Sequence, residues 1–140
     1  MVEQTVTSLP VRSNWPSEDN QNALFDEPHL RIVSRPRPWR PSTDVYETET
    51  AIVVRVEVAG MRESDFSLSL VDRTLFIKGV RQDVNERRAY HQMEIQFGEF
   101  SSEIELSSPI AVDQAEAVYR DGFLIIVLPK ARPTQIKVKG

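Results

Sequence analysis

Apolar side chains recur at every second position through the middle of this 140-residue chain, and this alternation restricts the fold more than any other feature. In residues 54–58, three valines alternate with Arg55 and Glu57. A period of two places alternate side chains on opposite faces, as in a β-strand with one buried face. Comparable ranges follow at 66–70, 75–81, 104–106 and 115–119, and a further apolar range lies at 123–128.

Short turns separate these ranges. Residues 71–74 predict a hairpin turn, and Asp121-Gly122 is the dipeptide that a type I′ turn prefers. The range 123–128 is apolar at every position and is expected to be a strand in the middle of a sandwich. Seven or so short strands at this spacing predict an all-β fold, an antiparallel immunoglobulin-like β-sandwich.

Proline divides the chain into three parts. Six of the nine prolines lie between positions 10 and 41, where they exclude a long helix or a central strand. We therefore expect residues 1–40 to be a flexible N-terminal arm, partly disordered or holding a short helix over about residues 19–26. Residues 41–129 form the predicted sandwich domain, and residues 130–140 form a C-terminal extension.

Charge is distributed unevenly over these parts. Residues 1–41 carry five basic and five acidic side chains, residues 42–128 carry eight basic and sixteen acidic ones, and residues 129–140 carry four basic ones and no acid. The net charges are therefore 0, −8 and +4. Because phosphate binding needs a basic face, the acidic domain argues against nucleic acid as a partner.

No membrane span is expected, because no apolar run approaches the roughly 20 residues that a transmembrane helix needs. The first ten residues lack both a basic start and an apolar stretch, so no secretory signal is evident. The cytoplasm is the expected location.

Residues suited to catalysis are scarce. The chain has no cysteine and two histidines, which excludes thiol nucleophiles, thiolate metal sites and a three-histidine zinc centre. Its serines form no Gly-x-Ser-x-Gly elbow, and its aspartates fall at predicted turns, where they serve local hydrogen bonding. We therefore expect no enzyme, no cofactor and no metal. A carbohydrate-binding or hydrolytic sandwich would need clustered aromatic residues or paired acids, and neither pattern is present.

The C-terminal extension contains Ile136-Lys137-Val138. Two β-branched residues spaced by two lie on one face of an extended segment, with the lysine opposite. Such a segment gains stability by adding to a sheet edge, with its two side chains in paired pockets. The alternative is a frayed tail in which the two residues are incidental.

Four stretches in this order resemble the small heat-shock proteins of the α-crystallin family, in its bacterial, plant and archaeal branch. They are Pro41–Glu47, Val58–Phe66, Leu75–Gly79, and Ala117–Lys130 with its alanine-x4-glycine-x-leucine signature. The likeness covers about residues 41–130 and the tail motif. It implies an ATP-independent holdase that binds unfolding proteins, suppresses their aggregation and assembles from dimers into larger oligomers.

The resemblance also implies roles for particular segments. Dimers would form by exchange of a strand carried on residues 83–94, and the tail would dock in a groove between two edge strands of a neighbouring dimer. Unfolding clients would meet apolar side chains of the arm. The residues implied are Tyr90, His91, Met93, Glu94 and Ile95 for strand exchange, Ile136 and Val138 for the tail, Leu68, Leu70 and Ala117 for the groove, and Trp15, Leu24 and Phe25 for client binding.

The chain departs from the family pattern at Ile95, at Ser102 and at Leu106-Ser107, where relatives tend to carry Leu-Pro. Relatives often have arginine where this chain has Ile95 and Ser102, so apolar contact at Ile95 would replace the expected ion pairs between subunits. An alternative is an interaction module of similar sandwich fold that does not oligomerise, resembling the CS-domain co-chaperones.

Overall fold

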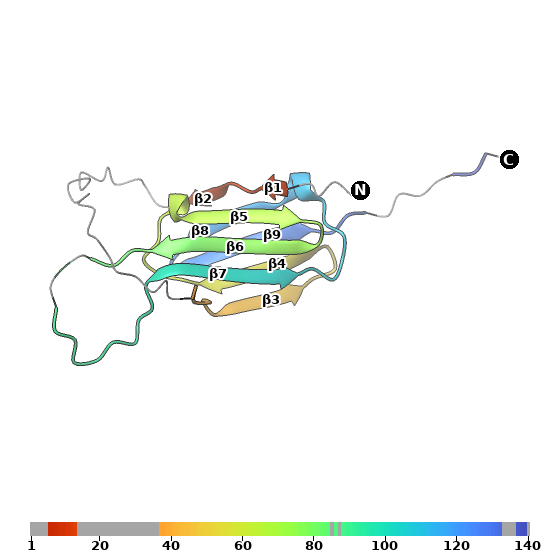
Figure 1. The fold of residues 1–140 in the computed structure, drawn as a ribbon. Helices are drawn as coiled ribbons and strands as arrows, with labels where there is room; N and C mark the ends of the chain where they lie inside the picture. Colours follow the sequence, from red (N-terminus) through yellow and green to blue (C-terminus); the bar gives the residue numbers. More distant parts are fainter. Residues whose placement is uncertain (1–5, 14–36, 85, 87, 133–136, 140) are drawn as a thin grey trace.

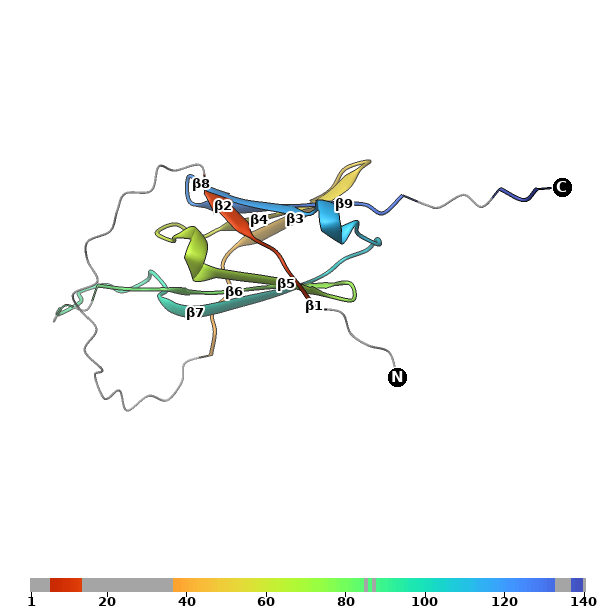
Figure 2. The same cartoon turned by 90° about the horizontal axis from the view of Figure 1, so that it is seen from above.

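The computed structural model describes residues 6–13, 37–84, 86, 88–132 and 137–139. Figures 1 and 2 show two β-sheets packed face to face. One sheet has the strand order β1-β5-β6-β7, and the other has the order β2-β8-β9-β4-β3. The strands are β1 (Val6–Ser8), β2 (Val11–Ser13), β3 (Thr43–Glu47), β4 (Ala51–Glu57), β5 (Phe66–Val71), β6 (Thr74–Arg81), β7 (Gly98–Glu105), β8 (Glu116–Arg120) and β9 (Phe123–Pro129), with short 3₁₀ turns η1 (Glu63–Asp65) and η2 (Val112–Gln114).

The predicted β-sandwich is confirmed. Strands β3 to β9 pair antiparallel with their neighbours, and among the described strands the parallel pair is β2 with β8. The predicted turn at Asp121-Gly122 is also confirmed, because both residues have positive φ, 50° and 80°, as type I′ geometry requires.

Alternate side chains of both sheets meet in a single core. In β4 and β9 the inward positions are almost completely buried, and the same holds for the inward positions of β5, β6 and β7. The buried cluster comprises Leu9, Ile52, Val54, Val56, Val58, Met61, Leu68, Leu70, Leu75, Ile77, Phe100, Ile104, Leu106, Ala117, Leu124, Ile126 and Leu128.

The expectation that residues 123–128 form a strand in the middle of the sandwich is confirmed. Strand β9 is central in its sheet, between β8 and β4, but only one of its faces is fully buried. Leu124, Ile126 and Leu128 point into the core, whereas Phe123 and Val127 point outward and are each 36% exposed. The outer face of this sheet has no second layer against it among the described residues, so an apolar sequence does not imply burial on both sides here.

Residues 6–13 of the predicted arm join the sandwich. Strand β1 pairs with β5 of one sheet, and β2 pairs with β8 of the other. Figure 2 shows this segment, coloured red, crossing from one layer to the other along one side of the molecule. The arm therefore contributes an edge strand to each sheet. The short helix expected over residues 19–26 lies outside the described residues.

Candidate assembly sites

The segment between β6 and β7, described at residues 82–84, 86 and 88–97, extends away from the sandwich as a large loop (Figure 1). All five residues predicted for strand exchange lie here: Tyr90, His91, Met93, Glu94 and Ile95. Each is exposed and outside regular structure. Met93 and Ile95 are 63% and 65% exposed, which is high for large apolar side chains with a core nearby. The structure thus brings these residues together on one projecting segment.

Arg81 holds the base of this loop. Its guanidinium donates hydrogen bonds to the carbonyl oxygen of Gln96, with an Nε distance of 2.9 Å, and to that of Ala59. It also lies over the rings of Trp39 and Phe97, 4.6 and 5.3 Å from their centroids. Because Arg81 ends β6 and Gln96 precedes β7, these contacts hold the two ends of the loop together.

The loop also has polar contacts within it. Arg88 forms ion pairs with Asp83 and Glu86, at 3.6 and 3.1 Å. The Tyr90 hydroxyl donates to Asp83 at 3.2 Å and accepts from Arg88 at 3.3 Å. Ion pairs this exposed contribute little free energy, because water and salt screen them. They favour one loop shape without locking it.

Strand β3 is the edge strand that lies on the opposite side of the molecule from β1 and β2. It pairs with β4 on one side, and no described strand pairs with its other edge. Val45 and Tyr46 on this strand are 48% and 47% exposed. An unpaired edge with exposed apolar side chains is a template for pairing with another strand.

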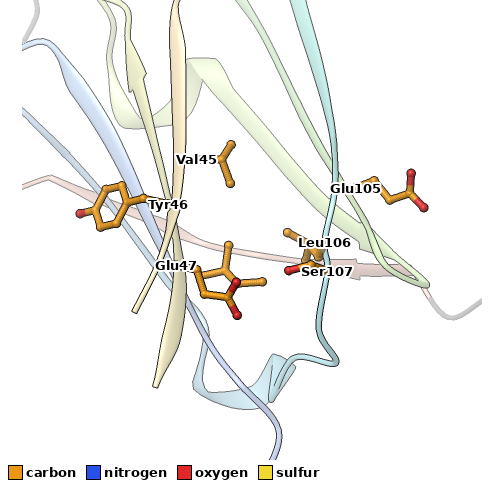
Figure 3. A pocket seen from close by; sticks show the side chains of 7 residues that line it. Val45, Tyr46, Glu47, Glu105, Leu106 and Ser107 are labelled. Atoms are coloured by element: carbon orange, nitrogen blue, oxygen red, sulfur yellow. The ribbon is translucent and has the colours of Figure 1, made fainter. Parts of the chain in front are cut away.

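A pocket lies beside this free edge, between β3 and the end of β7 (Figure 3). Val45 points toward the side of β7 and Tyr46 points away from it, as successive residues of a strand do. The lining combines apolar and acidic side chains, contributed by Val45, Tyr46, Glu47, Ile52, Glu105, Leu106 and Ser107.

The three residues predicted to line the tail-accepting groove lie close together on the side between β5 and β8, here called the β5–β8 side. Leu68 and Leu70 of β5 and Ala117 of β8 are only 2–3% exposed and belong to one buried cluster. Their side chains belong to the core between the two sheets, and the segment Val6–Val11 lies along the edges of both strands. The structure fills this side of the sandwich with the chain's own N-terminal residues.

Two residues that cover this side, Leu9 and Val11, were not anticipated. Leu9 is 8% exposed within the core cluster, and Val11 packs against the cluster. A signal was present in the sequence, since Leu9 and Val11 have the same two-residue spacing as Ile136 and Val138. The many nearby prolines obscured it, because they indicated an arm without strands.

The remaining predicted residues are only partly described. Val138 is 90% exposed, without contact to the core. Ile136 lies outside the described residues, as do the predicted client-binding residues Trp15, Leu24 and Phe25.

Ser102, one of the positions where the family resemblance led us to expect arginine, points into the core from β7 and is 2% exposed. Its hydroxyl is buried without a hydrogen-bond partner in the described part of the chain. Ile95, the other such position, is exposed on the loop, 65% accessible. The two positions therefore differ in environment, and only Ile95 is available to a second subunit.

Tyr119 on β8 holds the segment that follows β4 in place through two hydrogen bonds. Its hydroxyl donates to the carbonyl of Val58 at 2.8 Å and accepts from the amide of Met61 at 3.2 Å. Burial raises the pKa of the Tyr119 phenol above its ordinary value of about 10. This tyrosine is neutral and structural at physiological pH.

Residues 44–140 match the family model described as the Hsp20/alpha crystallin family. The chain belongs to the Hsp20/alpha-crystallin family. Among relatives of this small heat shock protein, "Small heat shock protein C2" of Rickettsia felis is 31% identical over 105 residues, covering 71% of this chain and 68% of the relative. "Heat shock protein 16" of Schizosaccharomyces pombe is 33% identical over 106 residues, covering 73% and 74%.

Solved structures agree with this assignment. Heat shock protein 16.0 from Schizosaccharomyces pombe superposes with a TM-score of 0.62 at 28% identity, covering 77% of this chain and 81% of the other. The hspA structure from Xanthomonas axonopodis gives a TM-score of 0.61 at 26% identity, covering 66% and 94%. The resemblance inferred from the sequence motifs is confirmed.

Members of this family are chaperones rather than enzymes, and they form oligomers; ATP-independent holdase activity is their general property. This small heat shock protein is accordingly a chaperone that forms oligomers. In the part of the chain that the structure describes, no helix is long and apolar enough to cross a membrane.

Proposed function

We propose that this small heat shock protein holds unfolding clients on its N-terminal arm and assembles through two separate sites on the sandwich. One site is the free edge of β3, which takes the loop of a second subunit to form a dimer. The other is the β5–β8 side, which takes the tail of a neighbouring dimer. Two observations together support this best. The outer edge of β3 has no strand paired with it among the described residues, and the projecting loop exposes Met93 and Ile95.

Strand exchange fits the chemistry of both surfaces. The loop presents exposed Tyr90, Met93 and Ile95, and the β3 edge presents exposed Val45 and Tyr46. Addition of the loop to β3 would satisfy the free backbone groups of the edge and remove apolar surface from water. The loop is anchored at its base by Arg81, so it projects as one unit. Ile95 then provides apolar contact where relatives often have arginine.

Tail docking fits the shape of Ile136-Lys137-Val138. Leu68, Leu70 and Ala117 form an apolar floor between two strands, and an extended segment added there would place two alternate side chains on it. The tail carries +4 and the domain carries −8, so charge favours the contact between neighbours. A single such contact is weak, and several in a closed assembly strengthen one another.

Client binding is assigned to the arm. Trp15, Leu24 and Phe25 are large apolar residues between prolines, in a stretch with too few apolar residues for a core of its own. Exposed apolar surface on an unfolding protein is the chemistry that such side chains recognise.

A light-scattering assay of a heat-denatured client, without ATP, tests the proposal. The triple variant Trp15→Ser/Leu24→Ser/Phe25→Ser is expected to suppress aggregation at least fivefold less well per mole than the native chain. Val6→Ser is the matched control, because Val6 is apolar, lies in the same arm and is 63% exposed on the sandwich. Full activity in the triple variant would move the client site onto the sandwich.

A further inference from the structure

The arm and the tail each contain two apolar residues spaced by two. In the arm they are Leu9 and Val11 with Pro10 between them, and in the tail they are Ile136 and Val138 with Lys137 between them. In an extended chain both pairs project from one face. The two segments therefore offer the same kind of side-chain pair to a sheet edge.

The arm segment is anchored to both sheets. Ser8 lies opposite Ser69 in the β1–β5 pair, and the Leu9 amide donates to the carbonyl of Leu68 at 3.1 Å. Two residues later Val11 lies opposite Ala117 in the β2–β8 pair. The segment thus uses the exposed edges of β5 and β8 together.

Burial identifies the residues that hold it there. Leu9 is 8% exposed and Val11 is half-buried against the core, whereas Val6 at the start of β1 is 63% exposed. Pro10 is exposed where the chain crosses from one sheet to the other (Figure 2), so its missing N–H leaves no ladder bond unmade. Leu9-Pro10-Val11 therefore occupies the β5–β8 side as a bound extended segment would, with two apolar side chains against the core and the proline exposed.

We infer that Leu9-Pro10-Val11 is an internal ligand of the β5–β8 side and competes there with the tail of a neighbouring subunit. The inference rests on the proposed docking of the tail at this side. An edge strand has one free edge, so β5 and β8 cannot pair with the arm and the tail at once. The arm has the advantage of tethering within its own chain, and the tail has the advantage of multiple contacts in an oligomer. Exchange between the two occupants sets the balance between small and large assemblies.

A reversible disulfide can lock the arm in place. Because Leu9 and Leu68 are a hydrogen-bonded pair, Ser8 and Ser69 are a non-hydrogen-bonded pair, with Cα atoms about 4.5 Å apart in such geometry. That separation suits a disulfide, whose Cα atoms lie about 4.4–6.8 Å apart. Both serines lie on the outer face, away from the core, and the native chain has no cysteine to interfere. The variant Ser8→Cys/Ser69→Cys is thus a switch between a locked and a free arm.

Mass is measured by light scattering for this full-length variant, oxidised and then reduced with dithiothreitol. We expect dimers in the oxidised form and large oligomers after reduction, with the native chain unaffected by the reductant. A second measurement uses a fluorescent peptide of residues 130–140, which is expected to bind the oxidised form at least tenfold more weakly than the reduced form. A peptide with glycine in place of both β-branched residues keeps the +4 charge and controls for electrostatic attraction.

Equal mass and equal peptide affinity in the two forms would overturn the competition, while the tail could still dock elsewhere. The double variant Leu9→Ser/Val11→Ser, with Val6→Ser as its control, tests the same point from the other side. It is expected to bind the peptide at least tenfold more tightly than the native chain. Failure of the peptide to bind even this opened variant would overturn tail docking at the β5–β8 side, and the competition with it.

Discussion

Gly79 leaves space for a row of aromatic rings that crosses one end of the sandwich. The ring of Phe100 lies 5.4 Å from that of Trp39 and 6.1 Å from that of Phe66, and Phe66 lies 5.1 Å from Tyr119. A Cβ atom on Gly79 would lie 2.4 Å from Phe100 and 2.7 Å from the carbonyl oxygen of Asp65. At this point the absence of a side chain permits the packing of its neighbours.

Gly79→Ala is therefore expected to destabilise the domain by about 1–3 kcal/mol, the usual cost of overpacking, because a backbone oxygen cannot move aside easily. Urea unfolding monitored by tryptophan fluorescence measures this loss. Lys78→Ala, at the adjacent exposed position, is the control and should change the midpoint little. Equal midpoints for Gly79→Ala and the native chain would contradict the packing shown here.

Tyr119 connects stability to pH. Its raised pKa means that the folded state holds the phenolic proton more tightly than the unfolded state does. The stabilisation is therefore complete below about pH 10 and is lost as the pH rises through the raised pKa. Tyr119→Phe should cost about 1–2 kcal/mol at pH 7, because the Val58 carbonyl and the Met61 amide lose their partner.

Urea unfolding between pH 7 and pH 11.5 checks this prediction. The difference in unfolding free energy between the native chain and Tyr119→Phe should shrink above pH 10. Tyr46→Phe, on the exposed edge strand, should leave the midpoint at pH 7 unchanged. A difference that stays constant to pH 11.5 would show that Tyr119 acts through packing alone.

At the scale of elements, the two sides of the β2-β8-β9-β4-β3 sheet differ in whether a strand from the N-terminal arm covers them. The β8 edge is covered by β2, while no described strand pairs with the outer edge of β3. In the β3–β4 ladder the amides of Glu57 and Thr48 donate to Ser42 and Ala51 respectively. Since hydrogen-bonded and non-hydrogen-bonded pairs alternate, the amide of Val45 points away from β4 toward the free edge.

Val45→Pro should therefore remove one donor from the free edge while leaving the β3–β4 ladder intact, as proline on an edge strand permits. We expect this variant to remain folded and to lose dimers, measured by sedimentation velocity at low micromolar concentration. Val45→Thr keeps the amide and a β-branched side chain, and it should remain dimeric. Dimers that persist in the proline variant would argue against strand addition at β3.

At the scale of the whole molecule, the folded domain and its two flanking segments differ in net charge and in how their apolar residues are covered. The acidic domain supplies the folded body, and the segments on either side of it carry short apolar motifs. The arm motif adds to the β5 and β8 edges, and we propose that the tail motif does so in a neighbouring dimer. Val138 is almost fully exposed in the single chain, and the proposed tail docking would cover its apolar surface in an assembly.

Ile136→Gly/Val138→Gly is expected to reduce the large oligomers to dimers, because each tail loses both docking side chains and roughly 2–5 kcal/mol of apolar burial. Native mass spectrometry measures the change in subunit number. Lys137→Gly removes the charge between them and should have little effect. Equal effects of the two variants would rule out side-chain docking.

The domain could be predicted from the sequence because each strand and turn is specified by residues that are neighbours along the chain. Alternation at 54–58, 66–70 and 75–81 identifies which side chains are buried, and Asp121-Gly122 specifies its own turn, so the sandwich and its family motifs were readable without coordinates. Leu68, Leu70 and Ala117 belong to one buried cluster, but the edge strands expected there are not free, because β1 pairs with β5 and β2 pairs with β8. The partial exposure of the outer face of β9 could not be predicted, because apolar residues do not show whether a second layer covers them.

Only the tertiary structure decided what covers each edge. Leu9 and Val11 have the same spacing whether they lie free in solution or fill the β5–β8 side, and the choice depends on strands that are far away along the chain. The open edge of β3 is likewise a property of the assembled sheet, since Val45 and Tyr46 look like any other strand residues. Local periodicity determines which faces are apolar, and the pairing of distant edges determines which of them remain available to a partner.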